Sequence, residues 1–145
     1  MKILFAAFSA LALPVQASAF EMSPLFNVEI RLSDLAAAKL VSSGETISIN
    51  TLYYGDAKTS LDTEKGRVEV ATESAELAGA GSVAMGGIEL IEAEVAKTVG
   101  AIRMDLNVFT AGKVIERNIL SCGFWSDAVD KIPDPIVIEC ALIEE

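Results

Sequence analysis

Apolar and polar residues alternate along much of this chain, and a period of two is the spacing of a β-strand with one buried face. The clearest run is residues 102–109, in which Ile102, Met104, Leu106 and Val108 occupy every second position. Residues 88–99 fit either a strand or a short helix. Further strands are predicted at residues 28–32, 47–53, 68–72, 82–85, 114–122 and 136–143, the last almost wholly apolar and therefore expected inside a sheet.

One short helical turn interrupts the strands. Ser33 is a preferred N-cap residue type, residues 34–41 are rich in alanine, and Gly44 is suited to end the helix. Ala-Gly-Lys at 111–113 predicts a hairpin turn into the strand at 114–122. Seven to eight short strands with so little helix predict an all-β fold, an antiparallel β-sandwich, with a small closed barrel as the alternative.

The first nineteen residues have the three zones of a cleavable signal peptide. Lys2 supplies a positive start, residues 3–13 are apolar or small, and Ala17 and Ala19 form a small-residue cleavage site. Eleven such residues are too few to span a bilayer, which takes about twenty. We therefore expect residues 20–145 to form a single soluble β-sandwich domain that is periplasmic or secreted.

The charge balance is strongly acidic. The whole chain has eleven basic and twenty-one acidic residues, and removal of residues 1–19 takes away only Lys2, which leaves a net charge of −11. Negative charge opposes binding to nucleic acid and to anionic lipid, so no nucleic-acid partner and no membrane insertion are predicted. It favours encounter with a basic protein, although a solvated acidic surface without a partner has the same composition.

Two cysteines, Cys122 and Cys140, are the only ones in the chain. An even number of cysteines in an exported protein predicts a disulfide bond, and only one intramolecular pairing exists here. A redox pair normally has the much closer Cys-x-x-Cys spacing. We expect the bond to join the strand ending at Cys122 to the last strand, either as neighbours in one sheet or across two sheets.

The residue types that are missing exclude several kinds of chemistry. The chain has no histidine, which removes histidine-dependent nucleophilic catalysis and the usual catalytic zinc, copper and iron sites. Gly79-Ala80-Gly81 lacks the lysine of a phosphate-binding loop, and the acidic stretch 56–64 lacks the spacing of a calcium loop. No metal and no cofactor are predicted. Paired carboxylates, which hydrolyse glycosides, are the remaining catalytic option.

Two aromatic pairs, Tyr53-Tyr54 and Phe124-Trp125, lie beside acidic segments. Successive residues of a strand face opposite ways, so one of Tyr53 and Tyr54 is expected in the core and the other at the surface. Trp125 either packs in the core or is exposed. If Tyr54 and Trp125 are both exposed, they form a candidate binding surface together with Asp56 and Asp127, because aromatic residues anchor interfaces and charges steer them.

These observations favour a soluble, exported, non-enzymatic binding module of unknown ligand, for which a basic partner protein is the candidate that the charge suggests. One specific version is an inhibitor of a basic hydrolase such as a lysozyme. The alternatives are a carboxylate-dependent hydrolase, recognised by two carboxylates about 5 to 9 Å apart in a cleft, and a structural subunit of a cell-envelope assembly, recognised by an unpaired apolar edge strand.

Overall fold

A computed structural model of the chain describes residues 20–57, 66–92 and 99–145. The predicted signal peptide and most of the acidic stretch 56–64 lie outside the described residues. The elements run in the order β1 (Phe20–Met22), β2 (Leu25–Leu32), α1 (Asp34–Ser43), β3 (Ile47–Asp56), β4 (Arg67–Leu77), β5 (Gly81–Gly86), β6 (Glu89–Glu92), β7 (Arg103–Thr110), β8 (Leu120–Cys122), β9 (Trp125–Ala128), the short 3-10 helix η1 (Val129–Lys131) and β10 (Ile136–Leu142).

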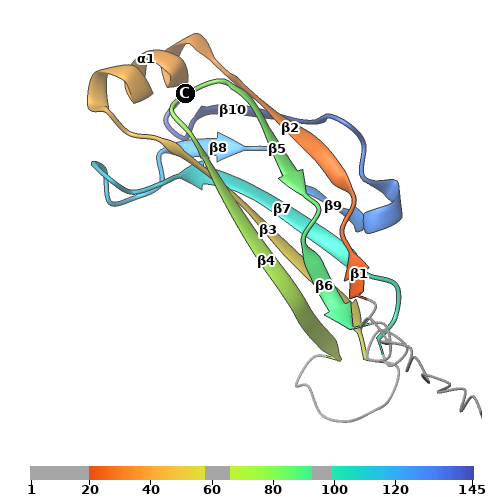
Figure 1. Ribbon diagram of the computed structural model, residues 1–145. Coiled ribbons are helices and arrows are strands. Elements are labelled where there is room, and N and C mark those ends of the chain that lie inside the picture. The colour runs from red at the N-terminus through yellow and green to blue at the C-terminus, as the bar shows by residue number, and fades with distance from the viewer. Residues whose placement is uncertain (1–19, 58–65, 93–98) are drawn as a thin grey trace, which may run out of the picture.

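The strands form two four-stranded sheets that pack face to face, as the sequence predicted (Figure 1). One sheet has the order β5-β2-β10-β8 and the other the order β4-β3-β7-β9, while β1 and β6 form a separate two-stranded ribbon. The sheets do not close into a barrel, so the barrel alternative is wrong. Among the described strands, all pairings are antiparallel except that of β2 with β10, in which Val28 lies opposite Ile136.

The alternation in β7 has the predicted consequence. Met104, Leu106 and Val108 are buried in the core between the sheets, whereas Asp105 and Asn107 face outward. The same core includes Val28 and Ile30 of β2 and Ile136 and Ile138 of β10. β10 lies between two other strands, as expected from its apolar sequence, but its Val137 and Glu139 are exposed on the outer face of the sheet.

The helix α1 begins and ends with the predicted residues. The Ser33 hydroxyl accepts a hydrogen bond from the amide of Ala36 at 3.1 Å, which satisfies one of the free amides at the helix start. Gly44 adopts a left-handed conformation with φ of 72° and donates its amide to the carbonyl of Leu40. Ala36 and Leu40 are the helix residues buried against the sandwich, and most of the remaining surface of α1 is exposed.

The predicted hairpin from β7 into a strand at 114–122 is wrong. Residues 111–119 form an irregular loop, and only Leu120–Cys122 form a strand, which belongs to the opposite sheet. The prediction of the hairpin did not consider Glu45. The Glu45 carboxylate accepts hydrogen bonds from three successive loop amides, those of Lys113, Val114 and Ile115. Amides bonded in this way are not available to a strand ladder.

Cys122 and Cys140 form a disulfide bond. The two residues lie directly opposite each other on β8 and β10, so the bond joins neighbouring strands of one sheet, which was one of the two predicted arrangements. No helix in the described part of the chain combines the length and the apolar character needed to cross a membrane.

Candidate functional site

The outward surface of the β4-β3-β7-β9 sheet is mostly polar, and we call it the polar face. Residues paired across neighbouring antiparallel strands point to the same side of a sheet, so the register defines its members. The polar face comprises Ser48, Asn50, Leu52, Tyr54 and Asp56 of β3, Arg67, Glu69, Thr72, Ser74 and Glu76 of β4, Arg103, Asp105, Asn107 and Phe109 of β7, and Ser126 of β9.

A shallow hollow of about 380 Å³ lies in the middle of the polar face. Asn50 and Asn107 lie opposite each other on β3 and β7, and the Ser74 hydroxyl donates a hydrogen bond to the Asn50 side-chain oxygen at 2.6 Å. Glu69 and Glu73 of β4 also line the hollow. Amide and hydroxyl groups beside two carboxylates can bind the ammonium or guanidinium groups of another molecule.

Tyr54 lies at one end of the polar face in a network of polar contacts. Its hydroxyl donates to Asp105 Oδ1 at 3.0 Å, and the Arg67 guanidinium stacks 3.3 Å from the ring centroid while donating to Asp105 Oδ2 at 2.8 Å. Burial raises the pKa of Asp105, but hydrogen bonds from Ser126, Arg67 and Tyr54 outweigh it and leave the pKa below its usual value. Asp105 is therefore held as a carboxylate.

The expected exposure of one of the two tyrosines is not observed. Tyr53 is fully buried, and Tyr54 is only 9% exposed although it faces outward from the sheet. The sequence alternation places Tyr54 on the correct face. The covering guanidinium comes from Arg67, a residue on the next strand whose position sequence reasoning did not consider.

The structure does not bring the four predicted surface residues together. Tyr54 and Asp56 lie on the polar face, Asp56 being exposed at the end of β3. Trp125 and Asp127 lie opposite Leu106 and Met104 respectively, which places them on the other side of the same sheet. Trp125 is half-buried and packs against the core, the arrangement that the sequence left open as the alternative to exposure.

Carboxylates neutralise almost all of the described basic residues. Seven lysines and arginines and eighteen aspartates and glutamates are described, and six of those seven cations lie in ion pairs. The exposed pairs add little stability, because water and salt screen them. They do leave six of the seven described cations less able to attract an anionic partner. The pairs are Arg31 with Glu29, Arg67 with Asp105, Arg103 and Lys131 with Asp127, Lys113 with Glu76, and Arg117 with Glu144.

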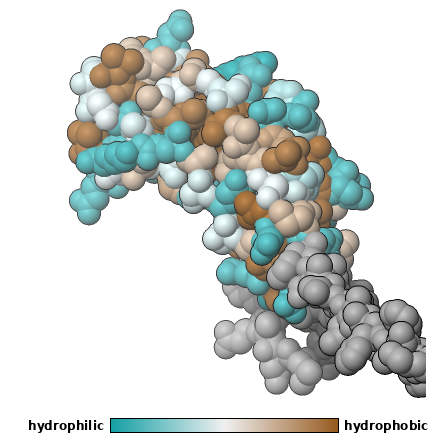
Figure 2. Space-filling model, in the orientation of Figure 1, coloured by the Kyte–Doolittle hydropathy of each residue, from teal (hydrophilic) through white to brown (hydrophobic). Residues whose placement is uncertain are grey.

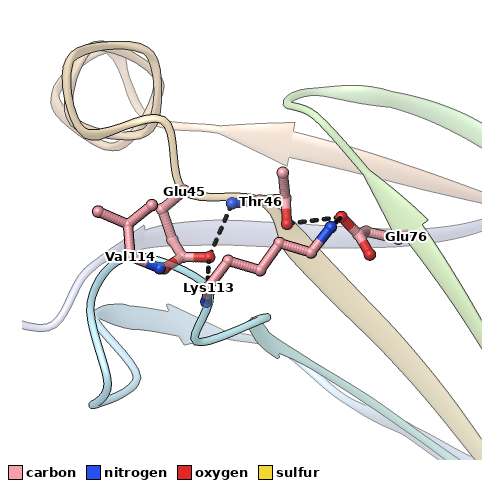
Figure 3. A network of polar contacts seen from close by, with 5 residues as sticks. All are labelled: Glu45, Thr46, Glu76, Lys113 and Val114. Carbon is pink, nitrogen blue, oxygen red and sulfur yellow. Dashed lines mark hydrogen bonds and ion pairs between the residues drawn. The ribbon is translucent and has the colours of Figure 1, made fainter.

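Glu45 is the most deeply buried of the described carboxylates, with 1% of the residue exposed (Figure 3). It accepts amide hydrogen bonds from Thr46 and from the loop residues Lys113, Val114 and Ile115 at 2.8 to 3.2 Å. Those bonds, led by that of Ile115, lower the pKa of Glu45 to about 2. Sequence reasoning missed this residue, because no local pattern marks a glutamate whose partners lie about seventy positions away.

Hydrolysis by a pair of carboxylates gains no support from the environments of the described acidic residues. A general acid needs a carboxyl group whose pKa is raised towards neutrality. Hydrogen bonds instead lower the pKa of Glu76, through Lys113 and Thr46, and of Glu145, through Ser33 and Leu142. Within residues 20–57, 66–92 and 99–145, no three acidic or cysteine side chains group closely enough to hold a metal ion.

The fold and the polar face define a class of protein in structural terms: an acidic, disulfide-linked β-sandwich with a polar sheet face. The chain matches no protein-family model, no curated protein and no solved structure.

Proposed function

We propose that this protein is an exported, non-enzymatic binding module that recognises a basic partner protein through the polar face. The observation that carries the proposal is the neutralisation of six of the seven described cations by carboxylates of the same chain. Because eighteen described acidic residues face those seven cations, the surface potential is negative and attracts positively charged surfaces.

The polar face suits such a partner better than the surface predicted from sequence. Asn107 and Glu69 present side-chain oxygens at the hollow, and each can accept a hydrogen bond from lysine or arginine. The network of Tyr54, Arg67 and Asp105 lies beside the hollow and holds its own side chains in place. A preorganised surface loses less conformational entropy on binding than a flexible one does.

Export is supported by the signal-like segment 1–19 and by the disulfide bond, which persists in oxidising compartments.

The hydrolase alternative has no observation of this kind in its support. Glu69 and Glu73 both line the hollow, but both carboxylate oxygens of Glu73 already accept hydrogen bonds from the amide of Gly86. The assembly alternative is not favoured at β4, because the exposed side chains of this edge strand include Glu69, Thr72 and Glu76 rather than large apolar residues.

A pair of charge-reversal variants tests the proposal. Glu69→Lys changes the polar face, whereas Glu116→Lys makes the same change in net charge on the exposed loop 111–119. Binding is measured to a lysozyme as a defined basic protein and to basic proteins captured from a periplasmic extract, at low and at high salt. We expect Glu69→Lys to weaken binding at least about fivefold more than Glu116→Lys, because only Glu69 lies at the contact surface.

Equal weakening by the two variants would show that net charge alone governs binding and would refute a role for the polar face. No binding of any basic protein at either salt concentration would refute the proposed function.

A further inference from the structure

An apolar groove of about 320 Å³ lies at the end of the molecule formed by α1. Its apolar lining comes from Ile115 and Ile119 of the loop after β7 and from Leu142 and Ile143 at the end of β10. Figure 1 shows α1 and the C-terminus together at this end, and Figure 2 shows hydrophobic and hydrophilic residues intermixed there. We call this feature the C-terminal groove.

The walls of the C-terminal groove are held in place by hydrogen bonds. The Ile143 amide donates to the carbonyl of Ile119 at 2.9 Å, which joins the two walls. Glu145 accepts hydrogen bonds from the Ser33 hydroxyl at 2.6 Å and from the Leu142 amide at 2.9 Å, which ties the chain end to the start of α1. Glu45 holds the beginning of the loop. The groove is therefore largely preformed, as small-molecule sites usually are.

A basic side chain lies at the rim of the groove in a protein that is acidic overall. Lys39 of α1 lines the groove and, among the described cations, is the one without a carboxylate at ion-pair distance in the described part of the chain. Arg117 and Glu144 also lie at the rim and pair with each other at 3.4 Å. Lys39 is therefore a local positive charge at the rim, and the nearby Glu145 carboxylate is bonded to Ser33 and Leu142.

We propose that the C-terminal groove binds a small carboxylic acid with an apolar tail, such as a medium-chain fatty acid. The tail lies along Ile115, Ile119 and Ile143, and the carboxylate forms a charge-assisted hydrogen bond with the Lys39 ammonium group. A second copy of the chain does not suit this groove, because two molecules of net charge −10 repel each other. This site is separate from the polar face and does not depend on the proposed function.

Two amphiphiles of equal chain length and opposite charge distinguish the local charge from the overall charge. Decanoate and decyltrimethylammonium are titrated into the protein, with binding followed by calorimetry and by NMR shifts of backbone amides. The overall charge of the protein favours the cation, whereas Lys39 favours the anion. We expect saturable decanoate binding at least about fivefold tighter than that of the cation, with shifts centred on residues 115–119 and 142–144.

Substitutions at exposed positions keep the fold and test the two parts of the site. Lys39→Gln should weaken decanoate binding about tenfold, the value of one charge-assisted hydrogen bond, whereas Lys131→Gln, at a cation paired with Asp127, should not. Ile143→Ser, at a side chain that is 59% exposed, should also weaken binding. The matched control is Leu25→Ser, at the end of β2 that is remote from α1.

Each of the following results would overturn the proposal. Decyltrimethylammonium could bind as tightly as decanoate, the amide shifts could lie outside the groove, or Lys39→Gln could have no more effect than Lys131→Gln. The protein is also titrated with phosphatidylglycerol vesicles. Binding to the vesicles without saturable binding of free decanoate would show that the groove binds a membrane surface instead of a free acid.

Discussion

Removal of the disulfide bond should destabilise the fold by about 3 kcal/mol. The bond closes a loop between residues separated by 18 positions, and the chain-entropy relation for a loop of that length yields about 3 kcal/mol at 25 °C. For a domain of this size, each kcal/mol lowers the midpoint of thermal unfolding by roughly 3 to 5 °C. The variant Cys122→Ala/Cys140→Ala should therefore unfold roughly 10 to 15 °C below the oxidised protein.

The position of the bond adds a local expectation. β8 is an edge strand that pairs with β10 through only three residue pairs, one of which is the disulfide itself. Hydrogen exchange in the double variant should consequently accelerate most at Ser121 and Ala141, the pair next to the bond, and least at the β3–β7 pairing, which spans eight residue pairs.

Urea and thermal unfolding of the oxidised protein, the reduced protein and the double variant provide the measurement. The reduced protein keeps both sulfur atoms, so its difference from the double variant isolates the packing of Cys140, which is 4% exposed. A loss below about 1 kcal/mol in both altered forms would refute the reasoning, because the unfolded chain would then gain far less freedom than the loop length requires.

Two further perturbations test other parts of the fold. The pKa of Glu45 is lowered to about 2 from its usual 4.5, so the contribution of its carboxylate to stability is present above about pH 4.5 and is lost as the pH falls towards 2. The midpoint of urea unfolding should therefore fall more steeply over this pH range in the wild type than in Glu45→Gln. Parallel pH profiles of the two proteins would contradict the assignment. Gly86 has φ of 88°, and a Cβ there would lie 1.9 Å from the carbonyl oxygen of Pro24, so Gly86→Ala should cost more than about 1 kcal/mol in urea unfolding. Gly79→Ala, where a Cβ meets nothing within 4 Å, is the control, and an equal loss in both would contradict the steric argument.

Local patterns in the sequence predicted most of the fold, because the features concerned depend on near neighbours. The alternation of Met104, Leu106 and Val108 identified β7 and its buried face. The residue types at Ser33 and Gly44 identified both ends of α1. A period of two and a cap residue are both visible within a few positions of the chain.

The incorrect predictions involved partners that are distant along the chain. Residues 114–122 have a strand-like composition, but Glu45 binds the amides at the beginning of this segment from across the fold. Tyr54 was placed on the correct face of its strand, but its burial depends on Arg67 from the neighbouring strand. The polar face and the C-terminal groove are likewise assembled from separate strands, so no single stretch of sequence indicates either of them.

The parallel pairing of β2 with β10 has a consequence for the order of folding. Val28 and Ile136 are neighbours in the folded sheet, yet more than a hundred residues separate them in the chain. The inner edge of β2 therefore stays without its partner until the last strand is available, and the core between the sheets cannot close earlier. A chain of such high contact order folds slowly and late. Such a delay suits the export that we propose. A polypeptide that crosses a membrane as an unfolded chain must not complete its core before its last strand has crossed.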